Sequence, residues 1–556
     1  MNRLYTLIST LLIATAAIAQ PSWTKKASKS VFTLKTFAAD GTLIGSSNGF
    51  FTGEQGEALS SFTPFKGASS AVVIDAQGHE MPVECMLGAN DTYDVARFRV
   101  AAKKTAPLSV ATTAATEGTS VWMLPYRETK VIQGTIRKTE TIGSGHAYYT
   151  VAMTMPEGTT NCPLINDAGE VVGLMQQPFR QNDTLSYAVS ARFADSLHIN
   201  GLSINDATLR STNIRKDLPA DLDQAVLSLY IGQASLDSIQ YVMLINDFIS
   251  RFPNAPEGYT YRAQSKLADM DFDGAARDME QAIRVADKKD EAHFNYSKLI
   301  YQKEIYMSQT PYEPWSLDKA LSETREASKL NPMAIYRHQE AAILFAQKKY
   351  AEAADIYNSL FDSELRSPDI FYEASRCKAA LKDTIGQIAL LDSCVAMFSQ
   401  PYLKEAAPYL LARAQVLMDA GQNRKAVSDL NEYEKLMMAS VNDRFYYLRY
   451  QAEVGGRLFQ QALNDIDRAI QMAPQYDIYY AEKASLQVRV GMTDEAIATA
   501  TECIKIAPDH SDGYLFLGIA QCQKGLKAEG IKNLQKAREL GDPQADGLIE
   551  KYTNDK

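Results

Sequence analysis

Two different hydrophobic patterns divide the chain. Over residues 30–197, short alternating or continuous apolar runs are separated by Gly, Asn and Asp turns; Ser30–Phe37 and Glu170–Met175 are two such runs. Many short strands at close spacing predict a β-barrel or a sandwich. From about Leu218 onward the pattern changes to long stretches with helical periodicity, rich in Ala, Leu, Tyr and Lys. We therefore expect an all-β part followed by an all-α part.

The helical half repeats itself with a period of 34 residues. A small residue at Ala462 recurs at Ala496, and the proline at Pro474 recurs at Pro508. Such a period in helix–turn–helix sequence is typical of tetratricopeptide repeats. Small residues let the two helices of a hairpin approach closely, and the proline ends the second helix. The same spacing links the tyrosines that we expect to fill the gaps between hairpins: Tyr446, Tyr480 and Tyr514.

These patterns predict a multidomain protein. An all-β domain over 20–200 precedes a linker over 201–221. About nine tetratricopeptide repeats then form an all-α superhelix over 222–542, and a capping helix and tail fill 543–556. An extra loop is expected in the array between Ser308 and Trp315.

The first residues have the pattern of a secretory signal peptide. Arg3 supplies a positive charge, an apolar run follows, and Ala17-Ile18-Ala19 offers the small residues that a signal peptidase reads. Cleavage after Ala19 would make Gln20 the N-terminus. A transmembrane anchor is the alternative, but the stretch is short and ends in small rather than basic residues. We expect a periplasmic or secreted protein with residues 1–19 removed.

Composition narrows the possible partners. The 556 residues hold 57 Lys and Arg against 67 Asp and Glu, a net charge of −10, with no basic cluster. This balance argues against nucleic acid as a partner. No segment after the leader approaches 18 uninterrupted apolar residues, so we do not expect the mature chain to be embedded in a membrane.

Four stretches of the β region carry a family resemblance. They are 49–56, bracketed by glycines; 91–100, which begins at an Asp; 158–173, with the sequence GTTNCPLINDAGEVVG; and 185–190. In this order they resemble the Deg-type, trypsin-like serine proteases. The resemblance implies that residues 20–200 form a trypsin-like double β-barrel with a catalytic triad between the two barrels.

The resemblance fails at the catalytic positions. When the sequence is aligned with the family on these motifs, Thr63 stands at the position of the catalytic His and Thr160 at that of the nucleophile. Asp94 matches the acid of the triad. A hydroxyl is a poor nucleophile unless a base lies within hydrogen-bond reach and an acid orients that base. Thr63 cannot take and return a proton near neutral pH. Gly158 would keep part of an oxyanion hole, but we predict no catalytic residues and no protease activity.

Three other residues of the barrel region are considered as substitutes. His79 and His146 lie in Gly-containing turns, and we expect both to be solvated turn residues rather than bases. Cys162 stands two positions after Thr160, so we expect a small buried residue rather than a thiol nucleophile.

The remaining chemistry-bearing residues form no recognisable motif. No His/Cys pair has zinc spacing and no Gly-rich loop precedes Lys-Ser or Lys-Thr, so we predict neither a metal nor a cofactor. Two cysteine pairs on packed helices leave two alternatives open, a disulfide or buried thiols. These pairs are Cys377 with Cys394 and Cys503 with Cys522.

The repeats provide the candidate binding surface. Extended concave surfaces of such arrays dock peptides and proteins. Four first-helix residues are candidates for a partner-binding groove: His338, Tyr447, Gln451 and Arg489.

Three functional hypotheses follow. The first is a non-catalytic scaffold, in which the repeats dock a protein or peptide and the inactive barrel is a second recognition domain or a spacer. The second is a divergent serine-type endopeptidase whose repeats recruit substrate. The third is a periplasmic assembly factor whose barrel is purely structural. Thr63 and Thr160 favour the first hypothesis over the second.

Overall fold

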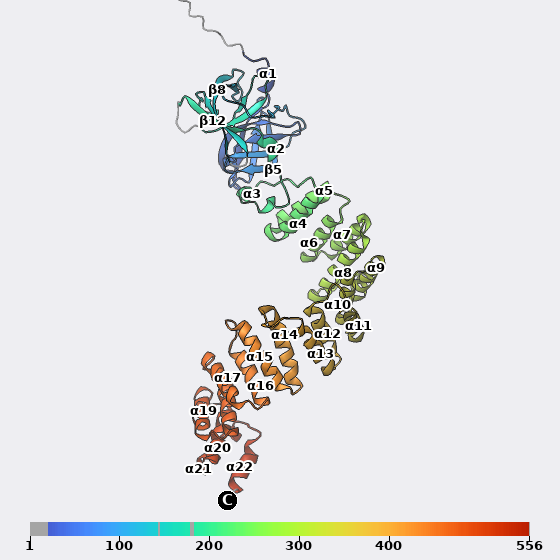
Figure 1. Ribbon diagram of the computed structural model, residues 1–556, viewed down its shortest axis with the longest axis vertical. Helices are drawn as coiled ribbons and strands as arrows, with labels where there is room; N and C mark the ends of the chain where they lie inside the picture. The colour runs from blue at the N-terminus through green and yellow to red at the C-terminus, as the bar shows by residue number, and fades with distance from the viewer. Residues whose placement is uncertain (1–19, 143–144, 178–182, 555–556) are drawn as a thin grey trace, which may run out of the picture. The chain divides into compact units, whose positions relative to one another are not determined.

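The computed structural model describes residues 20–142, 145–177 and 183–554. The predicted signal peptide, residues 1–19, lies outside the described residues. The chain divides into two compact units, of which the first ends at Asp287 and the second begins at Lys288. Two β-barrels followed by a long helical region confirm the predicted fold class (Figure 1).

The first barrel is closed by six antiparallel strands in the order β1-β2-β3-β6-β5-β4. Side chains alternate between the interior and the surface along β1, as a period of two requires. Aromatic rings fill the interior, with Phe32 packed on Phe51 and Phe65 packed on Phe98. The strands are β1 (Val31–Phe37), β2 (Leu43–Phe51), β3 (Glu57–Ser60), β4 (Ser70–Ile74), β5 (Glu80–Asn90) and β6 (Val95–Val100).

The second barrel is also closed, in the order β10-β11-β12-β9-β8-β7. Tyr149 lies in its core, and the hydroxyl of this side chain accepts a hydrogen bond from the Ala115 N–H at 3.3 Å. The strands are β7 (Ser120–Met123), β8 (Ile132–Ile142), β9 (His146–Ala152), β10 (Pro163–Ile165), β11 (Val171–Met175) and β12 (Leu185–Ser190).

A third apolar cluster joins the two barrels. It combines Val31 and Leu59 of the first barrel with Leu124 and Ile165 of the second. Phe193 belongs to the same cluster and comes from the short helix α2 (Phe193–Ser196), which follows the last strand. This cluster fixes the barrels against each other, so loops from both barrels can form one site at their junction.

The stretch predicted as a linker, 201–221, is folded onto the first barrel. It contains η2 (Ser203–Asn205) and α3 (Ala207–Arg210), and Leu209 and Ile214 belong to the core of the first barrel. The Met86 N–H of β5 donates to the Arg215 carbonyl at 2.8 Å. Apolar residues at 209 and 214 are therefore anchors, and we call residues 203–217 the connector.

Two helical hairpins complete the first unit. Aspartates cap three of their helices: the side chains of Asp221, Asp237 and Asp271 each accept a hydrogen bond from a backbone N–H three residues later. The four helices are α4 (Leu222–Ser235), α5 (Ser238–Arg251), α6 (Pro256–Ala268) and α7 (Phe272–Val285).

The second unit is built from consecutive antiparallel hairpins. Neighbouring helices pair as α8 with α9, and so on to α20 with α21, and α22 packs on α21. The helices are α8 (Lys289–Tyr306), α9 (Leu317–Leu330), α10 (Ala334–Ala346), α11 (Tyr350–Ser359), α12 (Pro368–Ala380), α13 (Thr384–Ala396), α14 (Ala407–Asp419), α15 (Asn423–Met437), α16 (Asp443–Gly455), α17 (Phe459–Met472), α18 (Asp477–Arg489), α19 (Thr493–Ile506), α20 (Ser511–Gln523), α21 (Lys527–Glu539) and α22 (Ala545–Asn554).

The periodic residues have the packing roles that their spacing suggests. Ala462 and Ala496 are fully buried on the second helices of their hairpins. Tyr446 packs against the cores of two successive hairpins. The first helix of several hairpins ends at a residue in the left-handed region, with φ between 58° and 90°, which turns the chain into the second helix. These residues are Lys348, Lys382, Gly421, Arg457, Gly491 and Gly525.

The extra loop after α8 is also packed. Trp315 is almost fully buried, and its Nε1 donates to the Tyr296 hydroxyl at 3.0 Å. Trp315 therefore anchors the loop to the hairpin core, whereas most other residues of the loop are exposed.

Buried Arg–Asp pairs recur inside the hairpins at a separation of 16 residues. The Arg413 guanidinium donates to both carboxylate oxygens of Asp429 at 2.8 and 2.7 Å. The Arg449 guanidinium donates in the same way to Asp465 at 2.6 and 3.0 Å. In the first unit, Arg262 makes the same pair with Asp278. Each pair ties the first helix of a hairpin to its second helix by a bidentate, charge-assisted contact.

Candidate functional site

The turn 158–161, between β9 and β10, corresponds to the nucleophile turn of the proteases that the chain resembles. Gly158 has φ +78° and Asn161 has φ +64°, so both lie in the left-handed region. Glycine adopts this conformation at no steric cost, and asparagine is one of the few other residues that tolerate it. The turn therefore enters the left-handed region at both ends, although Asn161 is not a glycine.

Asn48 of β2 holds this turn in place from the first barrel. Its Nδ2 donates to the Gly158 carbonyl at 2.8 Å and to the Thr160 carbonyl at 3.0 Å. Asn48 is largely buried. A side chain of one barrel thus fixes the turn of the other, and the site spans both barrels.

Thr160 is the residue that the sequence motifs align with the nucleophile of the proteases. Its hydroxyl donates to the Gln177 side-chain carbonyl at 2.8 Å, and the residue is half-buried. Within the described ranges, no histidine makes a hydrogen bond to Thr160. An amide oxygen accepts a hydrogen bond but does not take a proton near neutral pH, so this contact does not activate the hydroxyl.

Thr63 and Asp94 lie together on the first barrel. Thr63 begins the 3₁₀ turn η1 (Thr63–Phe65) and is exposed. One oxygen of Asp94, Oδ1, accepts the N–H of Phe62 at 3.0 Å and that of Thr63 at 2.6 Å. The Asp94 carboxylate therefore holds the backbone at Thr63, the residue that the motifs align with the catalytic histidine.

A buried polar network lies behind the turn. Asn161 Nδ2 donates to the Ser47 hydroxyl at 2.7 Å, and Ser47 Oγ lies 3.0 Å from Ser61 Oγ. Ser60 donates to the Asn48 carbonyl at 2.6 Å. Among the described residues, Asn161 Oδ1 is buried without a hydrogen-bond partner. Sequence reasoning did not select these serines; their only signal is the polar run Ser46-Ser47-Asn48 inside a strand.

Cys162 is fully buried, and burial raises the pKa of its thiol to about 12. The thiolate is the reactive form, so this side chain is inert at neutral pH. All six cysteines are buried free thiols, including Cys377, Cys394, Cys503 and Cys522. Of the two alternatives left open by the sequence, the structure has the thiols.

The two histidines considered as substitute bases have other partners. His79 pairs with Asp75 at 3.0 Å in an exposed turn. His146 stacks on Phe193 and its Nε2 lies 3.1 Å from the Ser196 hydroxyl. Burial lowers the pKa of His146, and the nearby charge of Arg192 lowers it further. His146 is therefore a packed residue rather than the solvated turn residue that its sequence suggested.

Three of the four groove candidates lie on the first helices of two adjacent hairpins. Tyr447 and Gln451 lie one turn apart on α16, and the Tyr447 hydroxyl donates to Glu482 of α18 at 3.2 Å. Tyr447 stacks on Tyr450 and contacts Tyr479, and burial raises its pKa to about 12. Arg489, at the end of α18, is exposed with its guanidinium 5.9 Å from the Phe459 ring centroid.

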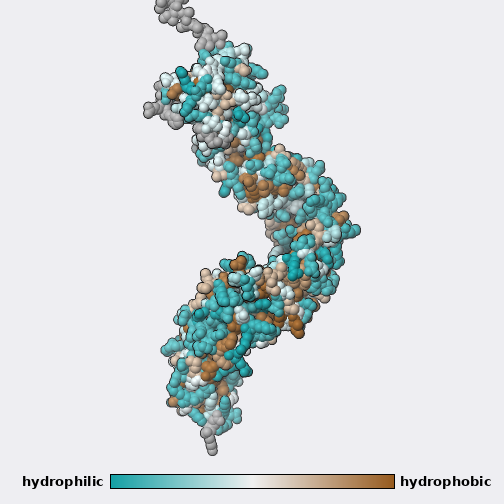
Figure 2. Space-filling model, in the orientation of Figure 1, coloured by the Kyte–Doolittle hydropathy of each residue, from teal (hydrophilic) through white to brown (hydrophobic). Residues whose placement is uncertain are grey.

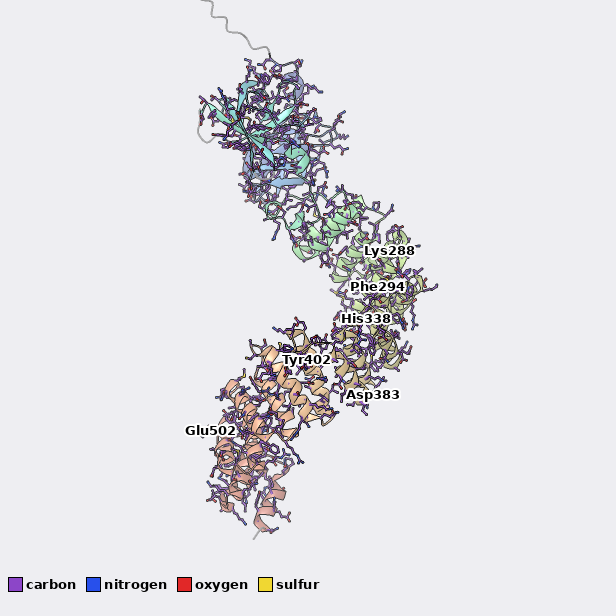
Figure 3. The ribbon with its side chains drawn as sticks, viewed as in Figure 1. Lys288, Phe294, His338, Asp383, Tyr402 and Glu502 are labelled. Atoms are coloured by element: carbon purple, nitrogen blue, oxygen red, sulfur yellow. The ribbon has the colours of Figure 1, made fainter. Side chains whose placement is uncertain are left out.

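His338 lies elsewhere, on α10 (Figure 3). Its Nε2 is 2.6 Å from Glu373 of α12, and its ring packs edge-on against Tyr357. The structure thus places this candidate in a contact between two first helices, apart from the cluster of Tyr447, Gln451 and Arg489.

The residues that the structure describes include neither a metal-binding cluster nor a membrane-spanning helix. Over these residues, no group of three or more His, Cys, Asp or Glu side chains is arranged to hold a metal ion. No helix there has both the length and the apolar composition needed to cross a membrane.

Comparison with known proteins agrees with the barrel architecture. Residues 47–174 match a family model described as a trypsin-like peptidase domain. The crystal structure of a serine endoprotease from Yersinia pestis is similar at 17% identity and a TM-score of 0.27; the match covers 34% of this chain and 65% of that one, slightly under two thirds. A protease from M. tuberculosis in its active form matches at 17% identity and a TM-score of 0.29, over 35% of this chain and 92% of that one.

No curated protein matches the chain in sequence. The family match runs from within β2 to within β11, so it includes Thr63, Asp94 and Thr160 and none of the helical region. Together with the two closed six-stranded barrels, it assigns the fold of a trypsin-like peptidase domain to residues 47–174.

Proposed function

We propose that this protein is a non-catalytic interaction protein of the periplasm or the extracellular space. Its helical hairpins, which we interpret as tetratricopeptide repeats, dock a protein or peptide partner. Its protease-like barrels serve as a second recognition domain or as a spacer. The observation that carries the proposal is the pair of threonines at positions 63 and 160, where peptide cleavage needs a base and an activated nucleophile.

The contacts of these residues support an inert site. Thr160 would have to pass its proton to a base within hydrogen-bond reach, and its hydroxyl is bonded instead to Gln177. Asp94 has no imidazole to orient, and its Oδ1 accepts two backbone N–H groups. The space beside Gly158 is open, so it leaves room for the backbone of a bound peptide. Such room suits recognition of a peptide rather than its hydrolysis.

The docking surface that we favour is the cluster on α16 and α18. It offers an aromatic ring, a carboxylate and an exposed guanidinium within one pair of adjacent helices, from Tyr447, Glu482 and Arg489. Aromatic and arginine side chains are the residues that most often dominate binding at protein interfaces.

A capture experiment tests this surface. The mature protein is used to isolate a partner from its own envelope fraction, and the affinity of the purified pair is then measured for variants. Arg489→Ala and Tyr447→Phe remove a charge and a hydroxyl while keeping the helix packing, and we expect the first to weaken binding about tenfold. Lys435→Ala, an exposed change on the second helix α15, is the control. Wild-type affinity in both test variants would exclude this surface.

A divergent serine-type endopeptidase, whose repeats recruit substrate, is the alternative. The retained left-handed turn at Gly158 and the retained contacts of Asp94 favour it. It predicts that the mature protein hydrolyses casein and that Thr160→Ala abolishes this activity, whereas the nearby exposed change Thr154→Ala does not. Our proposal predicts no hydrolysis by any of the three proteins.

A further inference from the structure

A pocket of about 240 Å³ lies within the first unit, between the connector and the α4–α5 hairpin. A second hollow of about 220 Å³ adjoins it and shares Arg215, Asp217 and Asp247. Ligand pockets in proteins are hollows of a few hundred Å³ or more with apolar walls and a few polar groups. Neither the barrel site nor the cluster on α16 and α18 contributes a residue to this pocket.

The walls of the pocket are held by ion pairs and backbone hydrogen bonds. Arg215 of the connector donates to both oxygens of Asp247 on α5 at 2.7 Å. Arg251 of α5 donates hydrogen bonds to Asp217 of the connector and to the carbonyl of the next residue, Leu218. Burial alone would raise the pKa of Asp217, but Arg99 and Arg251 outweigh it and hold that pKa below its ordinary value. These contacts preorganise the pocket before any ligand enters.

The pocket has more positive than negative charge. Asp217 and Asp247 are both engaged by arginines, as described above. Lys216 and Arg210 also line the pocket, and neither has a carboxylate within ion-pair distance in the described part of the chain. The Lys216 ammonium donates to the Thr212 carbonyl at 2.7 Å, and burial lowers its pKa. A partly buried cation without a counter-ion favours an anion beside it.

Apolar residues line the pocket from both sides: Leu236, Met243 and Leu244 from the α4–α5 hairpin, and Ile204 and Ile214 from the connector. The hairpin also contributes polar groups, among them Ser228 and Gln240. Met243 is 51% exposed. Figure 2 shows apolar residues gathered over α4 and α5, next to the barrel part of the first unit.

We propose that this pocket binds a small amphiphilic carboxylate. Its head group pairs with Lys216 and Arg210, and its short hydrocarbon part lies against Leu236, Met243 and Leu244. A carboxylate with a hydrocarbon part fits better than inorganic phosphate, because only the former covers the apolar residues of the lining. A bound ligand contacts both the connector and α5, and so holds the first hairpin on the barrel.

Calorimetric titration of the mature protein tests the proposal, with octanoate, acetate and inorganic phosphate as probes. We expect octanoate to bind at one site, about tenfold more tightly than acetate or phosphate, because only octanoate buries hydrocarbon. Met243→Glu, at an exposed position that tolerates a charge, should weaken octanoate binding about tenfold by repulsion, and Met243→Gln, its neutral control, about twofold. Lys216→Met should weaken it by a similar factor, and the exposed Lys103→Met should leave it unchanged.

Three results would overturn the assignment. They are no saturable octanoate binding, phosphate binding that is tighter than octanoate binding, and octanoate affinity that is the same in wild type, Met243→Glu and Lys216→Met. Circular dichroism and the melting temperature establish that each variant is folded before titration.

Discussion

Glu453 on α16 is a buried acid in a crowded acidic environment, and its titration should make the stability of this hairpin depend on pH. Its side chain is 4% exposed, and among the described residues its Oε2 has no hydrogen-bond partner. Arg449 Nε lies 4.0 Å from Glu453 Oε1, but its short contacts are with Asp465, Asn431 and Glu434. Burial, with Asp465 nearby, raises the pKa of Glu453 from 4.5 to about 8.

The sign of the effect follows from proton binding. Between pH 4.5 and about 8 the folded hairpin holds a proton on Glu453 that the unfolded chain has lost, so stability falls as pH rises through this range. Each pKa unit corresponds to about 1.4 kcal/mol, which sets an upper limit of about 5 kcal/mol. Relaxation and water entry reduce the cost of a buried charge, and we expect about 2 kcal/mol.

Glu453→Gln removes the titration while keeping the shape of the side chain. The variant should match the wild type at pH 5 and exceed it by about 2 kcal/mol at pH 9. The assay is hydrogen exchange of the amides of α16 and α17, corrected for the intrinsic pH dependence of exchange, because repeat arrays unfold locally. Glu432→Gln, which removes a surface acid paired with Lys435, is the control and should follow the wild type at both pH values. Equal differences between Glu453→Gln and wild type at pH 5 and pH 9 would refute the reasoning.

Three further predictions concern packing, pairing and processing. Ala462→Leu or Ala496→Leu should overpack a hairpin and destabilise it by about 1–3 kcal/mol, measured by urea denaturation. Arg413→Met should cost about 3 kcal/mol in the same assay, because it leaves the Asp429 carboxylate buried and unpaired. Mass spectrometry of the protein isolated from its envelope should find Gln20 at the N-terminus, and a peptide that contains Met1 would contradict the predicted cleavage.

The architecture could be predicted because the spacing of apolar residues along the sequence indicates which elements form. A period of two in β1 and a spacing of 34 residues between Ala462 and Ala496 both describe which face of an element is buried. Gly158 and Asp94 stand in short motifs of adjacent residues, and the structure has Gly158 in a left-handed turn and Asp94 just before β6. Their assignment to catalytic positions stays a prediction from the motifs.

The features that could not be predicted depend on contacts between residues far apart in the sequence. Asn48 lies 110 residues from Gly158, and no local pattern marks the hydrogen bond between them. Residues 201–221 resemble a linker because they are mostly polar and lack a hydrophobic period. In the structure, Leu209 and Ile214 of this stretch complete the core of the first barrel.

Tyr447 shows the same limitation in the helical half. Its position on the first helix suggests a surface residue that can be changed freely. In the structure its ring packs against Tyr450 and Tyr479, so truncation to Ala would remove packing as well as a binding group. Tyr447→Phe is therefore the better probe of the hydroxyl.

The reactivity of Thr160 tests the central claim most directly. The mature protein is incubated with a serine-directed fluorophosphonate beside an active trypsin-like protease, and the intact masses are measured. A hydroxyl bonded to Gln177 without a histidine base should leave the protein unlabelled while the active protease is labelled completely. Stoichiometric labelling that maps to Thr160 and is lost in Thr160→Ala would contradict the non-catalytic account.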